Sequence, residues 1–195
     1  MGHSDDVMNP ERPEPLRDVT IRHAPREPVG PLVETLLAID DDASALYASG
    51  GFAIELAYEH PFVQAELARW AACTREGRVL LAEVDGQAVG FAAYARVDGL
   101  AYLDQLAVRC AFMRRGIGRA LVDAVVTAVQ ADGASALWLT TYAHLPWNGP
   151  YYGTLGFVRV EETACGPELR ALLEEQRAAL PAPDQRVAMV RAISG

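Results

Sequence analysis

The chain has 195 residues, of which 51% are hydrophobic, so it is large enough for one domain with a sizeable core. Its formal net charge of −9 argues against a nucleic-acid-binding protein, because neutralising phosphates requires a clustered basic surface. All 17 basic residues are arginine, which excludes modification of the chain at a lysine of its own.

Cysteine usage and hydropathy point to the compartment. Cys73, Cys110 and Cys165 are odd in number, widely spaced and without a Cys-x-x-Cys pair, which argues against a disulfide framework and against a structural zinc site. No apolar run approaches the roughly 20 residues that span a bilayer, and the N-terminus lacks a signal-peptide pattern. We therefore expect a soluble, cytoplasmic protein with no metal and no membrane partner.

In the N-terminal half, only some segments have a pattern that predicts secondary structure. Residues 1–15 are polar and rich in proline, which predicts a flexible N-terminal tail ahead of one domain over residues 16–195. Alternating hydrophobicity predicts a strand over residues 16–23, and three prolines break it over residues 24–31. Helical periodicity predicts helices over residues 32–47 and 63–76, with the aspartates at 40–42 as a candidate end of the first. Residues 48–62 have no assignable pattern.

In the C-terminal half, turn signals separate the predicted strands and helices more clearly. Residues 78–97 form a predicted hairpin around the turn Asp85-Gly86, which is a strong hairpin signal between two apolar runs. A strand over residues 100–108, a helix over 116–133 and a strand over 134–142 imply a parallel crossover. A short helix (146–155), a strand (156–162), a helix (166–180) and a closing strand (186–193) complete a mixed α/β domain.

The stretch over residues 103–121 carries the most chemistry. Gly116 and Gly118 lie in a turn that leads from a strand into a helix, where unpaired backbone N–H groups and the helix dipole favour an anion. Arginines at positions 114, 115 and 119 add donors suited to phosphate oxygens. A dinucleotide fingerprint would need glycine at Leu121, and a phosphate-binding P-loop would need lysine at Arg119, so neither motif is present.

Two segments resemble the GCN5-related N-acetyltransferase (GNAT) family. The family's first motif is Gln/Arg-x-x-Gly-x-Gly/Ala, in which Gly116 and Gly118 match while Met113 stands where Gln or Arg is usual. Its second motif, an Asn, a Tyr and then Leu-Gly-Phe, is matched by Asn148, Tyr152, Leu155, Gly156 and Phe157. With the preceding hairpin, these segments cover about residues 78–160.

The resemblance implies a GNAT fold, that is, a single-domain mixed and mainly antiparallel sheet with a splayed parallel strand pair, flanked by helices. It also implies transfer of an acetyl group from acetyl-coenzyme A (acetyl-CoA) to a primary amine of a small molecule or peptide, by direct attack. The pantetheine arm would pair with the strand edge over residues 103–108. The implied cofactor-binding residues are Leu106, Ala107, Val108, Arg114, Arg115, Gly116, Ile117, Gly118, Arg119, Asn148 and Tyr152.

The same resemblance suggests the catalytic groups. Tyr152 would protonate the leaving thiolate as a general acid, although the adjacent Tyr151 could be the one that faces the site. Asp104 is the candidate base, acting through water or holding the ammonium, and His144 is a second candidate. Asp104 and Gln105 are expected to point to opposite faces of their strand, so one of them could simply face solvent.

Two alternatives, and the oligomeric state, stay open. Asn148 could serve only as the N-cap of the short helix. The protein could be a non-catalytic acyl-CoA-binding sensor of the same fold; the departure at Met113 keeps that class open, whereas Tyr152 in the expected place argues against it. A transferase that acts on charged tRNA would need a basic surface that this chain lacks. A homodimer is possible.

Overall fold

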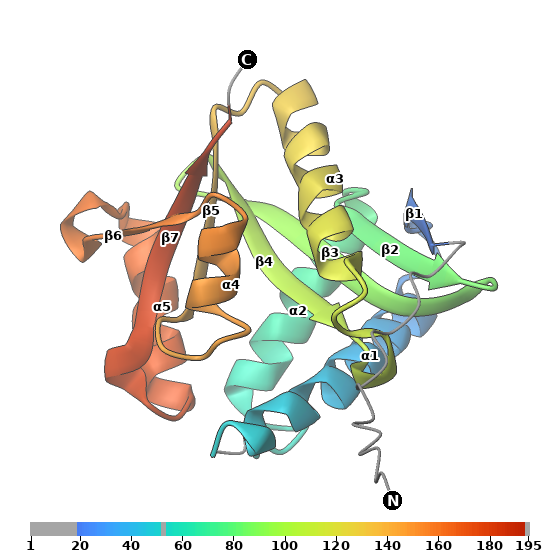
Figure 1. The fold of residues 1–195 in the computed structure, drawn as a ribbon, viewed down its shortest axis with the longest axis horizontal. Coiled ribbons are helices and arrows are strands. Elements are labelled where there is room, and N and C mark those ends of the chain that lie inside the picture. Colours follow the sequence, from blue (N-terminus) through green and yellow to red (C-terminus); the bar gives the residue numbers. More distant parts are fainter. Residues whose placement is uncertain (1–18, 52–53, 194–195) are drawn as a thin grey trace, which may run out of the picture.

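The computed structural model of the chain describes residues 19–51 and 54–193. The predicted tail over residues 1–15 lies outside this part. Within the described residues, seven strands form one mixed sheet in the order β1-β2-β3-β4-β5-β7-β6 (Figure 1). Their bounds are β1 Val19–His23, β2 Val79–Val84, β3 Gln87–Val97, β4 Leu100–Val108, β5 Ala136–Tyr142, β6 Val158–Val160 and β7 Arg186–Ala192. The α/β fold with one parallel strand pair is therefore confirmed.

Helices cover both faces of the sheet. Their bounds are α1 Val29–Ser49, α2 Pro61–Arg75, α3 Ile117–Ala131, α4 Gly149–Thr154 and α5 Pro167–Ala179. Helices α1 and α2 pack through Leu36, Ile39 and Trp70 on one face, and α5 covers the same face farther along through Leu173. Helix α3 packs its valines and Leu121 on the opposite face, because its apolar side chains recur at helical spacing.

Helix α1 does not end at the aspartates, contrary to expectation. It is continuous from Val29 to Ser49. Asp40 accepts a hydrogen bond from the Gln105 side chain, and Asp42 accepts one from the backbone N–H of Cys110 at 2.6 Å. Because Asp40 is bound by Gln105 of β4 and Asp42 by Cys110, just beyond the end of β4, these carboxylates anchor the helix to the sheet instead of breaking it.

The parallel pair β4 and β5 separates after two residue pairs. Ala101 pairs with Leu137 and Tyr102 with Trp138, and no further β4–β5 pairing occurs in the described residues. The predicted splay over residues 103–108 is thus confirmed. The antiparallel neighbours on the other sides of the pair, β3 and β7, stay in register with β4 and β5 over most of their length, so the gap opens only between β4 and β5.

A β-bulge at Asp104 changes where β4 points its side chains. Ala93 of β3 pairs with Gln105, and Tyr94 pairs with Leu103, which leaves Asp104 without an opposite residue. An extra residue of this kind breaks the strict alternation of faces. Asp104 consequently contacts Arg69 on α2, and Gln105 contacts Asp40 on α1, so both side chains face the same helical layer. The expectation that they point to opposite faces was wrong.

Candidate active site

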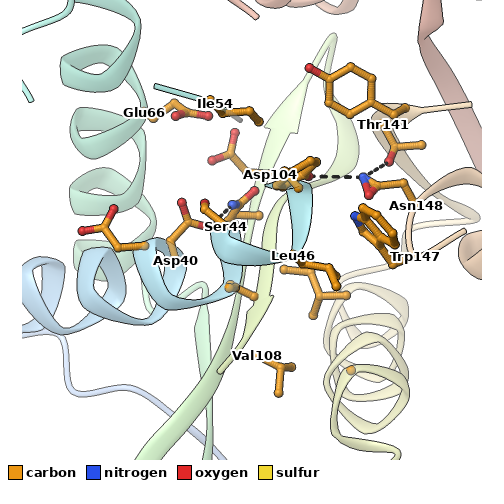
Figure 2. A pocket seen from close by; sticks show the side chains of 18 of the residues that line it. Asp40, Ser44, Leu46, Ile54, Glu66, Asp104, Val108, Thr141, Trp147 and Asn148 are labelled. Carbon is orange, nitrogen blue, oxygen red and sulfur yellow. Dashed lines mark hydrogen bonds between the residues drawn. The ribbon is translucent and has the colours of Figure 1, made fainter. Parts of the chain in front are cut away.

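A cavity of about 880 Å³ lies where β4 and β5 separate. Its walls come from both faces of the sheet and from residues far apart in the chain, between Leu37 and Arg186. Figure 2 shows Asp40, Glu66 and Asp104 on one side of this space and Thr141, Trp147 and Asn148 on the other. We call the part of the cavity wall at the start of α3, within residues 114–119, the turn side, and the part formed by Asp40, Glu66 and Asp104 the acidic side.

The turn side is built around the start of α3. Gly116 occupies the N-cap position with φ of 84°, in the left-handed region that favours glycine, and no described side chain caps the helix. Arg114 and Arg119 line the cavity, and Arg119 donates a hydrogen bond to the carbonyl of Thr154 at 3.3 Å. Arg115 instead lies over the ring of Phe112. Backbone donors and two arginines thus face one space, as an anion site requires.

The Tyr151 side chain leaves no room for a side chain at Gly118. A Cβ atom there would lie 2.7 Å from the hydroxyl of Tyr151, which is closer than real Cβ contacts. Tyr151 lines the cavity at this point, and Tyr152 lines it beside Tyr151 with their ring centroids 5.5 Å apart. Both tyrosines therefore face the site, Tyr151 with its hydroxyl beside the turn.

Burial keeps Tyr152 protonated. Its ring packs edge-on against Phe157, with centroids 5.6 Å apart, and burial raises the pKa of its phenol well above the usual value, with Tyr151 and Tyr47 adding to the effect. A phenol of this kind holds its proton at every working pH. It can donate a hydrogen bond or a proton, but it cannot serve as a resting anion.

Asn148 is at the N-cap of α4 but does not cap it. Its side chain makes no capping hydrogen bond and instead donates to Thr141 Oγ1 at 3.0 Å and to the hydroxyl of Tyr47 at 3.4 Å. Its Oδ1 atom is buried and has no hydrogen-bond partner among the described residues. The capping interpretation is therefore wrong, and a carboxamide oxygen in the cavity wall is left for a ligand donor.

Three carboxylates from three elements form the acidic side. Burial raises the pKa of Asp40 to about 6 despite its bond from Gln105. Burial, together with the charges of Asp40 and Asp104, raises the pKa of Glu66 to about 8. Burial also raises the pKa of Asp104, against the opposing effect of Arg69. Buried carboxylates with raised pKa values resist full ionisation, so a further cation beside them, such as an ammonium group, would stabilise their charged forms.

Arg69 contacts two carboxylates of the acidic side but is not itself a lining residue of the cavity. Its guanidinium lies 3.1 Å from Asp104, 3.8 Å from Glu175 and 3.9 Å from Glu66. The Asp104 side chain is only 4% exposed, whereas that of Glu66 is 28% exposed. Asp104 is thus committed to an ion pair, and Glu66 is the carboxylate with more freedom to meet a ligand.

The sequence-predicted residues are not all brought together. Leu106, Ala107 and Val108 line the cavity along β4, and Ile117 is a core residue at the first turn of α3. His144 is exposed, contacts the Tyr142 ring edge-on and is not among the residues that line the cavity. Three groups were missed by the sequence patterns: Glu66, Arg69 and Arg186. Only Glu66 and Arg69 carried a local signal, their i, i+3 spacing on a helix.

Other features of the described residues place limits on the site. Cys73, Cys110 and Cys165 are free thiols. No group of three or more His, Cys, Asp or Glu side chains in the described ranges is arranged to hold a metal ion. Over the same ranges, the helices are too short or too polar for any of them to cross a membrane.

The sheet with its splayed parallel strand pair, and the cavity between those strands, have the arrangement that the acetyltransferase resemblance implies, and comparison with known families agrees. The profile of the acetyltransferase (GNAT) family matches residues 44–157, more than half of the chain. The chain belongs to this family. It is an acetyl-CoA-dependent N-acetyltransferase.

Several solved structures share the fold. A GNAT-family acetyltransferase from Staphylococcus aureus Mu50 is 17% identical, with a TM-score of 0.63, covering 91% of this chain and 100% of that one. PaiA N-acetyltransferase from Thermoplasma acidophilum, in complex with coenzyme A, is 13% identical (TM-score 0.59; 90% of this chain and 99% of that one). N-acetylglutamate synthase from Neisseria gonorrhoeae, in complex with coenzyme A and N-acetyl-glutamate, is 18% identical, with a TM-score of 0.59 over 91% of this chain. This chain matches 36% of the length of that synthase.

Proposed function

We propose that the cavity holds acetyl-CoA on its turn side and a primary amine of a small molecule or peptide on its acidic side. The observation that carries this proposal is the continuity of the cavity across the separation of β4 and β5. An anion site of backbone donors opens at one side and a cluster of carboxylates at the other. A phosphate-bearing thioester and an ammonium group would approach each other from opposite faces of the sheet.

The described residues fit acetyl-CoA. The uncapped start of α3, with Arg114 and Arg119 beside it, suits the pyrophosphate. Beyond Tyr102, the edge of β4 has no strand partner on its β5 side, so its backbone groups suit the amides of a pantetheine arm. We assign cofactor contacts to Leu106, Ala107, Val108, Gly116, Ile117, Gly118 and Asn148. When bound, acetyl-CoA supplies the acetyl group as a thioester.

Tyr152 is our general acid. In the transfer, the amine nitrogen forms a bond to the carbonyl carbon, the carbon–sulfur bond breaks, and the leaving sulfur takes a proton. Tyr152 lines the cavity, and burial raises its pKa, so it is protonated at rest and would give up its proton only as negative charge develops on the leaving sulfur. Tyr151, whose hydroxyl lies beside Gly118, is assigned to the turn side.

Glu66 is our acceptor for the proton that the amine loses. Its pKa of about 8 lies close to working pH, which is the range in which a general base is most effective. Asp104 is paired with Arg69 at 3.1 Å, so we assign to it the positioning of Arg69 and the attraction of the ammonium form. His144 remains a candidate base, but its exposed position outside the cavity lining supports that role less well than the position of Glu66 does.

The proposal is tested by following thiol release from acetyl-CoA against a panel of small amines and peptide N-termini. We expect thiol release that depends on the amine, a matching N-acetylated product by mass spectrometry, and initial-velocity lines that intersect when both substrates are varied. Parallel lines would contradict direct attack. Coenzyme A binding without amine-dependent thiol release would contradict the proposed function.

A further inference from the structure

A second arginine lies at the cavity wall, and its charge is not balanced in the way that the charge of Arg69 is. Arg186 is the first residue of β7 and pairs across the sheet with Tyr142. It shares a strand face with Ala188, which packs against α5, so its side chain lies on the α5 side of the sheet. Helix α3 and its turn pack on the opposite face.

Arg186 is buried and lacks an acidic partner. The residue is 7% exposed, and none of the carboxylates in the described residues lies within ion-pair distance of it. Its Nη2 atom donates to the Gln176 side-chain oxygen at 2.6 Å, and its guanidinium lies 4.6 Å from the Tyr142 ring centroid. Its Nε atom is buried with no hydrogen-bond partner in the described part of the chain.

Arg69 provides the contrast. It is more exposed than Arg186, with 26% of its side chain accessible, and three carboxylates lie within 4.0 Å of it. A buried guanidinium with one neutral acceptor and an aromatic face is much less well compensated than that. Burying a charge without a counter-ion is costly, and such groups are normally paired or bind an anionic ligand.

The charge of Arg186 acts on the cavity. Arg186 is one of the lining residues, and it opposes the rise in the pKa of Tyr47, Glu66 and Tyr152, all of which also line the cavity. The cavity therefore combines a cluster of carboxylates and an unpaired guanidinium, both outside the turn side that we assign to the phosphates.

We propose that Arg186 binds a carboxylate of the acceptor, so that the acceptor is an amine that also bears a carboxylate, as a free amino acid does. The guanidinium fork matches a carboxylate in two parallel hydrogen bonds, and Nε is one of the donors that such a fork uses. The acidic side would hold the ammonium group of the same molecule. This inference rests on the proposed function of the acidic side.

The test compares two series of products in the presence of coenzyme A: the twenty N-acetyl-L-amino acids and their carboxamides. Each pair differs only in the carboxylate. We expect at least one N-acetylamino acid to bind the wild-type protein about 10- to 100-fold more tightly than its carboxamide, as a charge-assisted bidentate contact would give. In Arg186→Gln that preference should fall close to one. Arg170→Gln, which removes an exposed arginine of α5, should keep it.

A second variant covers the case in which Arg186→Gln does not fold. Gln176→Glu places a carboxylate where the Arg186 partner now has an amide oxygen, so the guanidinium is neutralised from within the protein. We expect this variant to bind coenzyme A normally and to lose the preference for the carboxylate. Such a result would not arise if Arg186 only tied β7 to α5, because the new ion pair would strengthen that contact.

The outcomes separate the two proposals. Equal binding of both series by the wild-type protein overturns the carboxylate site, as does an unchanged preference in a folded Arg186→Gln or Gln176→Glu variant. Acetylation of amines with no preference for a carboxylate overturns only the Arg186 inference. Because the product series measures binding and not turnover, the result for Arg186 stands even if no amine is acetylated and the proposed function fails.

Discussion

The two sides of the cavity differ in the groups that form them: main-chain groups on the turn side and side chains on the acidic side. The turn side consists of main-chain groups at the start of α3, with Gly116 in the left-handed region and Gly118 pressed against Tyr151. The acidic side consists of side chains brought together from α1, α2 and β4, with Asp40, Glu66 and Asp104 as its acids. Backbone recognition needs a particular local conformation, whereas side-chain recognition needs particular residues at distant positions.

The turn side therefore suits groups that every acyl-CoA substrate has in common, and the acidic side suits groups that differ between acceptors. Any acyl-CoA substrate presents the same pyrophosphate and pantetheine groups, and main-chain donors recognise them without regard to side chains. Acceptors differ in charge and shape, so the residues that meet them must differ as well. We therefore expect substitutions on the turn side to change cofactor affinity and substitutions on the acidic side to change acceptor use and pH dependence.

The largest expected effect comes from Gly116→Val. Valine strains a left-handed position by about 1–2 kcal/mol or more and moves the backbone donors at the start of α3. We expect coenzyme A binding to fall below detection by isothermal titration calorimetry. Gly133→Val is the matched control, since Gly133 has φ of 82°, open space around it and a place just beyond the other end of α3. Equal loss of binding in the control would refute the assignment of the turn.

Tyr152→Phe should come next. Loss of the proton donor should lower kcat by about 100-fold, the lower end of the usual range for general acid catalysis, with little change in coenzyme A affinity. Tyr151→Phe is the comparison, and we expect it to keep most of its turnover. If the large loss of kcat followed Tyr151→Phe and not Tyr152→Phe, the two roles would have to be exchanged.

Glu66→Gln should change the pH profile. The base must be deprotonated to work, and its pKa is raised to about 8, so wild-type kcat/KM, measured with an acceptor whose own ammonium group does not titrate near pH 8, should rise with pH through about 8 and then level off. In the variant this rise should disappear, and kcat/KM at pH 9 should fall about tenfold, because Asp104 and water remain to assist. Glu34→Gln, at an exposed position of α1, should keep the wild-type profile. A variant profile that still rises through pH 8 would exclude Glu66 as the base.

A smaller effect concerns stability. Asp40 and Glu66 have pKa values raised in the folded protein to about 6 and about 8, so the folded state binds more protons than the unfolded chain between about pH 4 and 8. The stability that these groups contribute is present at low pH and is lost as the pH rises through these values. At pH 8.5, Glu66→Gln should therefore raise Tm by about 2–4 °C, as a gain of about 1 kcal/mol would. A lower Tm would show that the Glu66 carboxylate is well compensated.

The smallest effect should come from Met113→Gln. Glutamine restores the residue that is usual in the first motif, but the backbone donors of the turn are already in place. We expect coenzyme A affinity to change by no more than about threefold, which is less than half of the free energy of a typical charge-assisted hydrogen bond. A tenfold or larger gain would mean that the side chain at position 113, and not the turn, limits binding.

Much of the turn side could be predicted from the sequence because it is local. Gly116, Gly118 and Asn148 lie within 33 residues of one another, and each glycine has a conformational or steric reason that a motif can express. The family resemblance, which rests on these same local motifs, also implied the splayed strand pair. The strand and helix order was also readable, except that α1 begins at Val29, where Pro31 is tolerated in the first helical turn.

The acidic side could not be predicted because it depends on tertiary contacts. The bulge at Asp104 has no sequence signature, yet it decides that Asp104 and Gln105 face the same helices. The sequence made Asp40 part of a candidate helix end, whereas its bond from Gln105 places it against β4. In the sequence, Arg186 is an ordinary residue of a predicted strand. Only its burial without an acidic partner among the described residues indicates a site for an anionic group.

Hydrogen–deuterium exchange with and without coenzyme A tests the division of the cavity most directly. We predict that coenzyme A alone protects backbone amides over residues 103–108 and 114–119, and that residues 37–47 and 62–70 gain protection only when an amine acceptor or its acetylated product is also present. Protection of the α1 and α2 residues by coenzyme A alone, without protection at the start of α3, would contradict the account.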